Sequence, residues 1–251
     1  MYMHPNRRRT KSAALVVAGL IPVAGVLAGA SSSSTGHVAS PEPVLAADVE
    51  HVAEKPVAKA PAETQKSVRK ESTSVTVFPA SVTSGEVPKT NFKAYRAAET
   101  TMARTDPTCR MGWKLIAGIG KVESHHANFG DVDADGELRT PIYGPVLNGS
   151  LAGNQVISDT DGGKLDGNAA YDRAVGPMQF LPSTWKHYGA DGNGDEKTDP
   201  QNVFDAALTT ARYLCDEGLD MKDGSGETQA VLRYNNSMDY VSKVTGFARS
   251  Y

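Results

Sequence analysis

Glu123 places a carboxyl group at a position that the sequence predicts to be buried. It lies in residues 113–130, which read WKLIAGIGKVESHHANFG, and it shares one helix face with Ile116, Ile119 and Gly120 at the spacing i, i+3, i+4 and i+7. Burial makes a charged carboxylate unfavourable by several kcal/mol, and the nearby C-terminal end of the helix opposes it by about 0.3–1 kcal/mol. Both effects raise a carboxyl pKa, so Glu123 is a candidate general acid.

A structural role for Glu123 is the alternative. Lys121, Arg139 and Arg173 are cations that could pair with its carboxylate at the end of the helix. Ion pairs of this kind also perturb carboxyl groups without any catalytic role. This stretch alone therefore leaves open whether Glu123 is a general acid or a member of a structural ion pair.

Gln179 is a polar residue within an apolar segment. Residues 174–185 read AVGPMQFLPSTW, and the side chains on either side of Gln179 are those of Met178 and Phe180. The Gln179 amide is therefore either a hydrogen-bonded core group or a partner for a sugar hydroxyl or acetamido group.

Tyrosines follow the last helical pattern, which covers residues 230–234. Tyr234 and Asn235 come at its end, and Tyr240 comes soon after it. A tyrosine beside a carbohydrate offers both a stacking face and a hydroxyl group. Tyrosines in a pair of C-terminal helices also commonly belong to the core, so these residues alone do not indicate a site.

A run of alternating oxygen-bearing residues predicts a shortened calcium loop. Calcium prefers hard oxygen ligands. A full calcium loop would have Gly in place of Glu196 and a bidentate Glu in place of Asn202, and neither is present. The alternative is a turn rich in Asp and Asn that caps the next helix. The candidate metal ligands are Asp191, Asn193, Asp195, the carbonyl of Lys197, and Asp199.

The segment 131–172 is rich in Gly and Asp and has little periodicity. Loops of this length are uncommon in compact domains and usually serve function, so we expect cleft walls beside Glu123. Asp131, Asp133 and Asp135 alternate like the first half of a calcium loop, but no carboxylate follows at the position that would complete it.

Helical periodicity predicts the elements that would position these groups. Phe92, Tyr95, Ala98 and Met102 are spaced for an amphipathic first helix, which Asp106-Pro107 would end, and residues 201–215 carry an apolar stripe typical of a core helix. These patterns predict a mainly α protein.

The first 89 residues have the composition of an export signal followed by a tether. Residues 1–30 join a basic start to an apolar stretch that ends in Ala-Gly-Ala, which is typical of a cleaved signal peptide, with a signal anchor as the alternative. Residues 31–89 are rich in Ala, Ser, Pro, Lys and Glu, and we expect them to be a disordered linker. The net charge of −3 gives no electrostatic reason to expect a nucleic-acid partner.

Cys109 and Cys215 are the two cysteines of the chain. In an exported protein an even number of cysteines indicates a disulfide, here between the start of the Glu123 helix and the end of the helix at 201–215. Two buried free thiols are the alternative.

Taken in order, these motifs resemble the lytic murein transglycosylases, specifically the soluble-lytic and membrane-bound B-type group with the lysozyme-like fold. The resemblance covers about residues 91–251. It rests on a helix that ends in VES, followed by GPMQFLPSTW, DGNGD and YNNSMDY. It implies a mainly α, lysozyme-like α+β fold, with one globular domain at residues 90–251.

The resemblance also assigns roles to residues. It implies that Glu123 is the single catalytic acid and base and that the shortened loop is a calcium site, while Asp172 stands near the position of a cleft serine in those relatives. The residues that would surround the sugar are Gln179, Tyr213, Tyr234, Asn235 and Tyr240.

The function implied is cleavage of peptidoglycan glycan strands with formation of 1,6-anhydromuramic acid ends. No cofactor would be required for the chemistry, and the enzyme would be an exported monomer with a possible membrane tether. One alternative is a hydrolytic muramidase that uses Asp133, Asp135 or Asp172 as a second carboxylate. Another is a wall-binding protein that holds glycan without cutting it.

Overall fold

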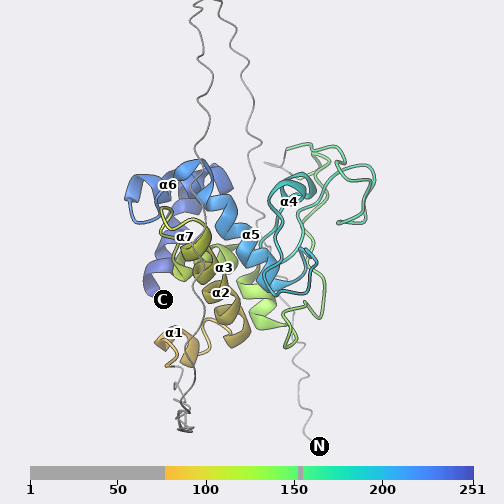
Figure 1. The fold of residues 1–251 in the computed structure, drawn as a ribbon. Helices are drawn as coiled ribbons and strands as arrows, with labels where there is room; N and C mark the ends of the chain where they lie inside the picture. Colours follow the sequence, from red (N-terminus) through yellow and green to blue (C-terminus); the bar gives the residue numbers. More distant parts are fainter. Residues whose placement is uncertain (1–76, 152–154) are drawn as a thin grey trace, which may run out of the picture. The chain divides into compact units, whose positions relative to one another are not determined.

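Helices provide nearly all the regular structure of residues 77–151 and 155–251, the parts of the chain that this computed structural model describes (Figure 1). The elements in these residues are α1 (Ala80–Thr83), α2 (Lys89–Thr105), α3 (Trp113–Gly130), α4 (Pro182–Tyr188), α5 (Val203–Cys215), the 3-10 turn η1 (Asp216–Gly218), α6 (Gly224–Tyr234) and α7 (Met238–Ser250).

The helix that carries Glu123 lies at the centre of the packing. Figure 1 shows α3 among α2, α5 and α7, and it packs against all three. Ile116 and Ile119 are fully buried, as the periodicity predicts. At Gly118 a Cβ atom would come within 2.5 Å of the Val244 carbonyl oxygen, so glycine is what lets α7 approach the α3 backbone.

The two helices that flank α3 follow their sequence patterns. The predicted first helix is α2, and its four apolar positions are buried. The predicted core helix at 201–215 is α5, which starts at Val203 because the Asn202 side chain accepts a hydrogen bond from the Phe204 amide and caps it. Both predictions are confirmed.

The C-terminal helices are longer than predicted. The pattern at 230–234 is only the end of α6, which starts at Gly224 after the capping residue Asp223. A second helix, α7, starts after Ser237, whose hydroxyl accepts a hydrogen bond from the Tyr240 amide. This cap places Tyr240 in the first turn of α7.

The segment between α3 and α4 is held by isolated bridges rather than by strands. Examples are the pairings of Tyr143 with Val175 and of Val175 with Phe180. In the described residues every β-pairing is of this kind, and the prediction of a mainly α protein is confirmed.

The start of the ordered domain differs from the prediction. Residues 77–89 were expected to belong to the linker at 31–89, but they include α1, and Val82 and Val87 are buried. The Phe78 ring lies edge-on to that of Phe92, with 5.8 Å between the centroids. The expected signal at 1–30 and the linker at 31–76 lie outside the described residues. Within those residues no helix is both long enough and apolar enough to cross a membrane.

Cys109 and Cys215 form the predicted disulfide. It joins the segment before α3 to the last residue of α5, and both half-cystines are buried. The disulfide therefore fixes the connection from α2 to α3 against the end of α5.

Candidate active site

Glu123 lies at the end of the right-handed part of α3. Its side chain is only 7% exposed, on the buried face of the helix. The five residues after Ser124, His125 to Phe129, all have φ between 52° and 65°, so the chain turns in the left-handed sense directly after Ser124. The Glu123 carboxyl group therefore lies where the backbone changes from right-handed to left-handed.

The partner of the Glu123 carboxyl group is Tyr240. The Tyr240 hydroxyl donates a hydrogen bond to Oε1 at 2.5 Å, while Oε2 makes no hydrogen bond within the described residues. Burial raises the pKa of Glu123 to about 7, although the hydrogen bond from Tyr240 lowers it in part. Burial and the proximity of Glu123 also hold the pKa of Tyr240 well above its usual value, so Tyr240 stays a donor.

The three cations proposed as ion-pair partners make other contacts. Lys121 lies over the Phe247 ring, and Arg139 lies 3.7 Å from the Asp131 carboxylate. Arg173 donates to the Gly144 carbonyl oxygen and lies over the Tyr143 ring. Throughout the described parts of the chain, Glu123 takes part in no ion pair. These contacts therefore do not support the ion-pair alternative for Glu123.

A cavity of about 130 Å³ adjoins the Glu123 side chain. Residues from α3 and its left-handed turn form one wall, and the predicted loop region supplies the opposite wall. Of the described residues that line it, Glu123 alone has a carboxyl group. The lining residues are Glu123, Ser124, His125, Asn128, Ile142, Tyr143, Gly144, Pro145 and Gln179.

Gln179 lines the same cavity as Glu123, as the family resemblance implied. Its backbone is left-handed, with a φ of 52°, and its Nε2 atom donates to the Gly176 carbonyl oxygen at 2.8 Å. Gly176 has a φ of 75°, and a Cβ atom there would lie 1.7 Å from the Pro200 carbonyl oxygen. This tight turn points the Gln179 amide into the cavity and leaves its Oε1 atom free to accept a hydrogen bond.

The lining of this cavity does not include Tyr213, Tyr234, Asn235 or Tyr240. The Tyr234 hydroxyl donates to the Met178 carbonyl oxygen at 2.7 Å, and its ring lies parallel to that of Tyr240. The Tyr213 hydroxyl donates to the Arg233 carbonyl oxygen. Tyr213 and Tyr234 are buried, and of the predicted tyrosines only Tyr240 donates a hydrogen bond to Glu123.

The candidates for a second carboxylate also lie outside the cavity lining. Asp172 is fully buried, and its two oxygens accept hydrogen bonds from the amide and the hydroxyl of Thr160. Asp133 accepts from the amides of Asp135 and Glu137, and the Asp135 side chain is exposed. The cavity lining therefore offers Glu123 no second carboxylate from this set.

Gln179 and the loop that follows it fall in a segment that is similar to a known domain. Residues 155–229 match the family model of the transglycosylase SLT domain. This match supports the resemblance to lytic transglycosylases as a group and does not separate the B-type from the others. It covers less than half of the chain, starting after Glu123 and ending before Tyr240. No curated protein and no solved structure matches the chain significantly.

The predicted calcium loop lies within the SLT-domain segment and folds as a series of turns. Asp191 accepts hydrogen bonds from the amides of Gly194 and Glu196, and Asp195 accepts from that of Lys197. The carboxylates of this loop do not converge on one point. In the described residues, the carboxylate oxygens that gather within 4.8 Å of one another without a cysteine are those of Asp159, Asp161 and Asp172.

Several residues of the cavity were not found from the sequence. His125 and Asn128 reach it because the chain after Ser124 is left-handed, which helical periodicity does not predict. The cleft walls expected in residues 131–172 are represented by Ile142 to Pro145, which line the cavity without any polar motif that singles them out. Tyr143 is 40% exposed, so it offers an aromatic surface near Glu123.

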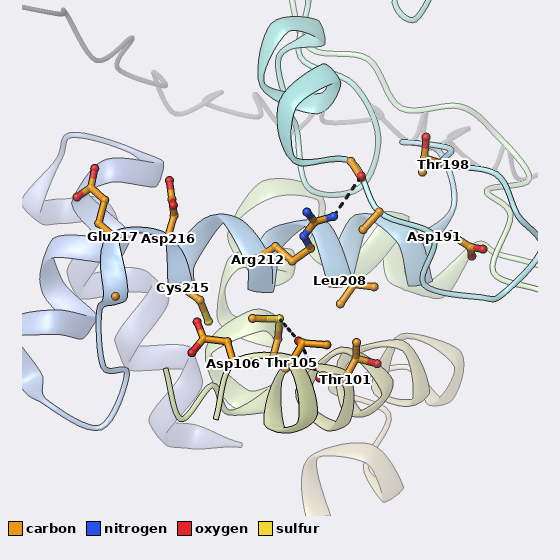
Figure 2. Close-up of a pocket in the computed structure, with 14 residues that line it drawn as sticks. Thr101, Thr105, Asp106, Asp191, Thr198, Leu208, Arg212, Cys215, Asp216 and Glu217 are labelled. Atoms are coloured by element: carbon orange, nitrogen blue, oxygen red, sulfur yellow. Dashed lines mark hydrogen bonds between the residues drawn. The ribbon is translucent and has the colours of Figure 1, made fainter. Parts of the chain in front are cut away.

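A larger cavity lies elsewhere, between α2 and α5, with a volume of about 840 Å³ (Figure 2). Figure 2 shows Arg212 donating to the Gly189 carbonyl oxygen there, with Asp191 and Asp216 also in the lining. A backbone hydrogen bond from Gly194 lowers the pKa of Asp191, and the Tyr188 hydroxyl lowers that of Asp216. Neither carboxyl group is prepared to donate a proton near neutral pH, unlike Glu123.

Proposed function

We propose that the protein is a peptidoglycan lytic transglycosylase that cleaves the β-1,4 bond after N-acetylmuramic acid in glycan strands. One observation carries the proposal: in the described lining of the cavity, Glu123 is the single carboxyl group, and burial raises its pKa to about 7. Hydrolysis by the usual glycosidase routes needs two carboxylates. A single carboxyl group suits a reaction in which water is not a reactant.

In the proposed mechanism Glu123 acts first as an acid. Its proton passes to the glycosidic oxygen, and the bond between that oxygen and C1 of N-acetylmuramic acid breaks. The acetamido oxygen of the same sugar stabilises the positive charge at C1. The Glu123 carboxylate then takes the proton of the C6 hydroxyl, whose oxygen attacks C1 and closes a 1,6-anhydro ring.

Neighbouring residues would hold the reacting groups in place. Tyr240 binds Oε1 of Glu123, so Oε2 would carry the proton that passes to the glycosidic oxygen. The free Oε1 atom of Gln179 can accept a hydrogen bond from a sugar N–H or hydroxyl group. Tyr143 offers a stacking surface on the opposite wall.

Mass spectrometry of the products tests this function. Purified peptidoglycan digested with the protein should release fragments whose muramic ends are one water lighter than reducing ends. Reducing ends alone would indicate a hydrolytic muramidase instead. Binding of glycan without cleavage would indicate a wall-binding protein.

The proposed substrate determines where the protein must act. Peptidoglycan lies outside the cytoplasmic membrane, so the protein must be exported, and the signal-like composition of residues 1–30 supports this. Glycan strands are then the partner, with the protein acting as a monomer.

The pH dependence of cleavage should reflect the protonation of Glu123. Only the protonated carboxyl group can start the reaction, so kcat/KM is expected to fall as pH rises through about 7. The hydrogen bond from Tyr240 lowers the pKa of Glu123, so Tyr240→Phe should move this decline to higher pH. The measurement is the rate of release of anhydro fragments between pH 5 and about 9.

Tyr234→Phe is the matched control. Its hydroxyl donates to the Met178 carbonyl oxygen and not to Glu123, so the decline should stay at the wild-type pH. A decline that moves to lower pH in Tyr240→Phe, or that moves equally in both variants, would contradict this account.

We also propose that the loop at Asp191 to Asp199 closes on a calcium ion. The candidate ligands in this loop include three carboxylates and the Asn193 amide oxygen, and the end of the loop leads into α5. The incomplete ligand set predicts a Kd of about 10⁻⁴–10⁻³ M. A hundredfold excess over Kd would add about 2.7 kcal/mol to the free energy of unfolding.

Thermal melts in calcium and in chelator measure this effect. Wild type should melt higher in calcium, Asp195→Ala should lose the difference, and Asp135→Ala in the other Asp-rich loop should keep it. Equal melting temperatures of wild type in both buffers would show that the loop is only a polar turn.

A further inference from the structure

His126 is a buried titratable residue that the proposed mechanism does not use. It follows Glu123 by three positions and is only 1% exposed, and it does not line the cavity. Its Nδ1 atom lies 3.0 Å from the Tyr95 hydroxyl, and its Nε2 atom lies 3.0 Å from the Tyr251 hydroxyl. Both ring nitrogens are therefore occupied by hydrogen bonds to two different parts of the fold.

The His126 ring is neutral at any pH at which the enzyme would work. Burial, together with the smaller effects of Lys121 and His125, lowers its pKa to about 3. A neutral imidazole has one N–H donor and one acceptor nitrogen. One tyrosine hydroxyl therefore accepts from the ring while the other donates to it, and both bonds can form together.

His126 lies in a segment whose backbone is unfavourable. It is the second of five consecutive non-glycine residues with left-handed φ and ψ angles, a conformation that such residues rarely adopt even singly. Contacts from the rest of the fold must hold it. One is the Ser124 hydroxyl, which donates to the Pro177 carbonyl oxygen and accepts from the Ala127 amide.

The left-handed turn has a cavity side and a core side. His125 and Asn128 line the cavity with Glu123, whereas His126 points into the core. There it bridges α2, through Tyr95, to Tyr251, the residue that follows α7. Since Tyr240 in the first turn of α7 binds Glu123, both ends of this helix are tied to the Glu123 segment.

The surrounding packing is shaped around this bridge. The Tyr95 hydroxyl lies so close to α3 that a Cβ atom at Gly120 would come within 2.4 Å of it. The Tyr251 ring stacks on Trp113 at the start of α3, with 6.3 Å between the centroids. The packing of each tyrosine therefore holds its hydroxyl group within hydrogen-bond distance of the imidazole.

We propose that His126 is a positioning residue that fixes the left-handed turn, and with it the Glu123 carboxyl group and the wall formed by His125 and Asn128. This inference rests on the proposed function. It deepens that function, because it names a group that acts on the reaction without touching the substrate.

The test compares His126→Phe with His126→Gln on soluble glycan strands. Phenylalanine keeps a ring but cannot bridge the hydroxyls, and displacement of Glu123 should lower kcat by about 10- to 100-fold. KM should change less than about threefold, because contacts along the glycan strand remain. Glutamine has a donor and an acceptor, so it should restore most of kcat.

Val244→Ala is the matched control for lost stability. Val244 is fully buried on α7 and takes no part in the bridge. The variant should melt lower than wild type but keep its kcat well below the melting temperature. If His126→Phe keeps kcat within about twofold, or if Val244→Ala loses as much kcat at equal folded fraction, the positioning role is wrong.

Hydrogen exchange separates this inference from the proposed function. Amides at residues 125–130 should exchange faster in His126→Phe and in Tyr251→Phe than in wild type or Val244→Ala, whether or not glycan is cleaved. Absence of anhydro products from wild type would overturn the function alone. Unchanged exchange at 125–130 in both bridge variants would overturn the positioning role.

Discussion

Glu123→Gln is expected to reduce glycan cleavage by at least about 10²–10⁴-fold, the usual contribution of one general acid or base. The amide keeps the size of the side chain and can still accept the hydrogen bond from Tyr240, but it has no proton to exchange. Because one carboxyl group would serve both steps, the loss should lie at the upper end of this range or beyond it. The measurement is the release of anhydro-ended fragments from purified peptidoglycan.

A carboxylate outside the cavity gives the matched control. Asp135→Asn removes an exposed charge from the segment after α3 and should keep activity within about threefold of wild type. If Glu123→Gln instead stays within about tenfold of wild type, the acid is another residue. Pull-down on insoluble peptidoglycan should show that Glu123→Gln still binds glycan.

Stability provides evidence that the inactive variant is folded. The pKa of Glu123 is about 7 in the folded protein, against 4.5 for an unperturbed glutamic acid side chain. The stabilising contribution of its protonated form is thus complete below pH 4.5 and is lost as pH rises through 7. The loss amounts to about 3 kcal/mol for a shift of this size. Glu123→Gln has no such loss, so it should melt higher than wild type at pH 8.5 and close to it at pH 5.

Apolar periodicity was sufficient to predict the helix that carries Glu123 and two of the helices that pack against it. Burial of one face of α2, α3 and α5 drives their packing, and a face repeating every three to four residues is visible in the sequence. The prediction that Glu123 is a general acid came from the same apolar pattern. The burial of Glu123 and its hydrogen bond from Tyr240 are consistent with that prediction. The position of Gln179 in the same cavity agrees with what the family resemblance implied.

The remainder of the site depends on features that periodicity does not encode. Five non-glycine residues after Ser124 take left-handed angles because tertiary contacts, including those of His126, outweigh their local preference for a right-handed helix. The walls at Ile142 to Pro145 come from isolated bridges, which have no repeat. Tyr213 and Tyr234 belong to the core because their hydroxyls reach backbone carbonyl groups, which their residue type does not reveal.

Loss of the disulfide is expected to lower the free energy of unfolding by about 2–5 kcal/mol. Cys109 and Cys215 are 106 residues apart in sequence, so the link restricts most of the unfolded domain. It also fastens the segment before α3 to the end of α5, two elements that pack with α2. A domain of ordinary stability, about 5–15 kcal/mol, would lose a large part of it. Urea unfolding of Cys109→Ala/Cys215→Ala against wild type measures the change.

The variant removes two buried sulfur atoms as well as the bond, so wild type with and without reductant is the control. Reductant should lower the urea midpoint of wild type and leave that of the double variant unchanged, because only wild type has a bond to break. Cleavage of glycan well below the melting temperature should be retained in both, since the disulfide lies outside the lining of the Glu123 cavity. Alkylation of native protein without reductant should modify neither cysteine. Two alkylated thiols, or a midpoint that reductant does not move, would show that these cysteines do not stabilise the fold as a disulfide.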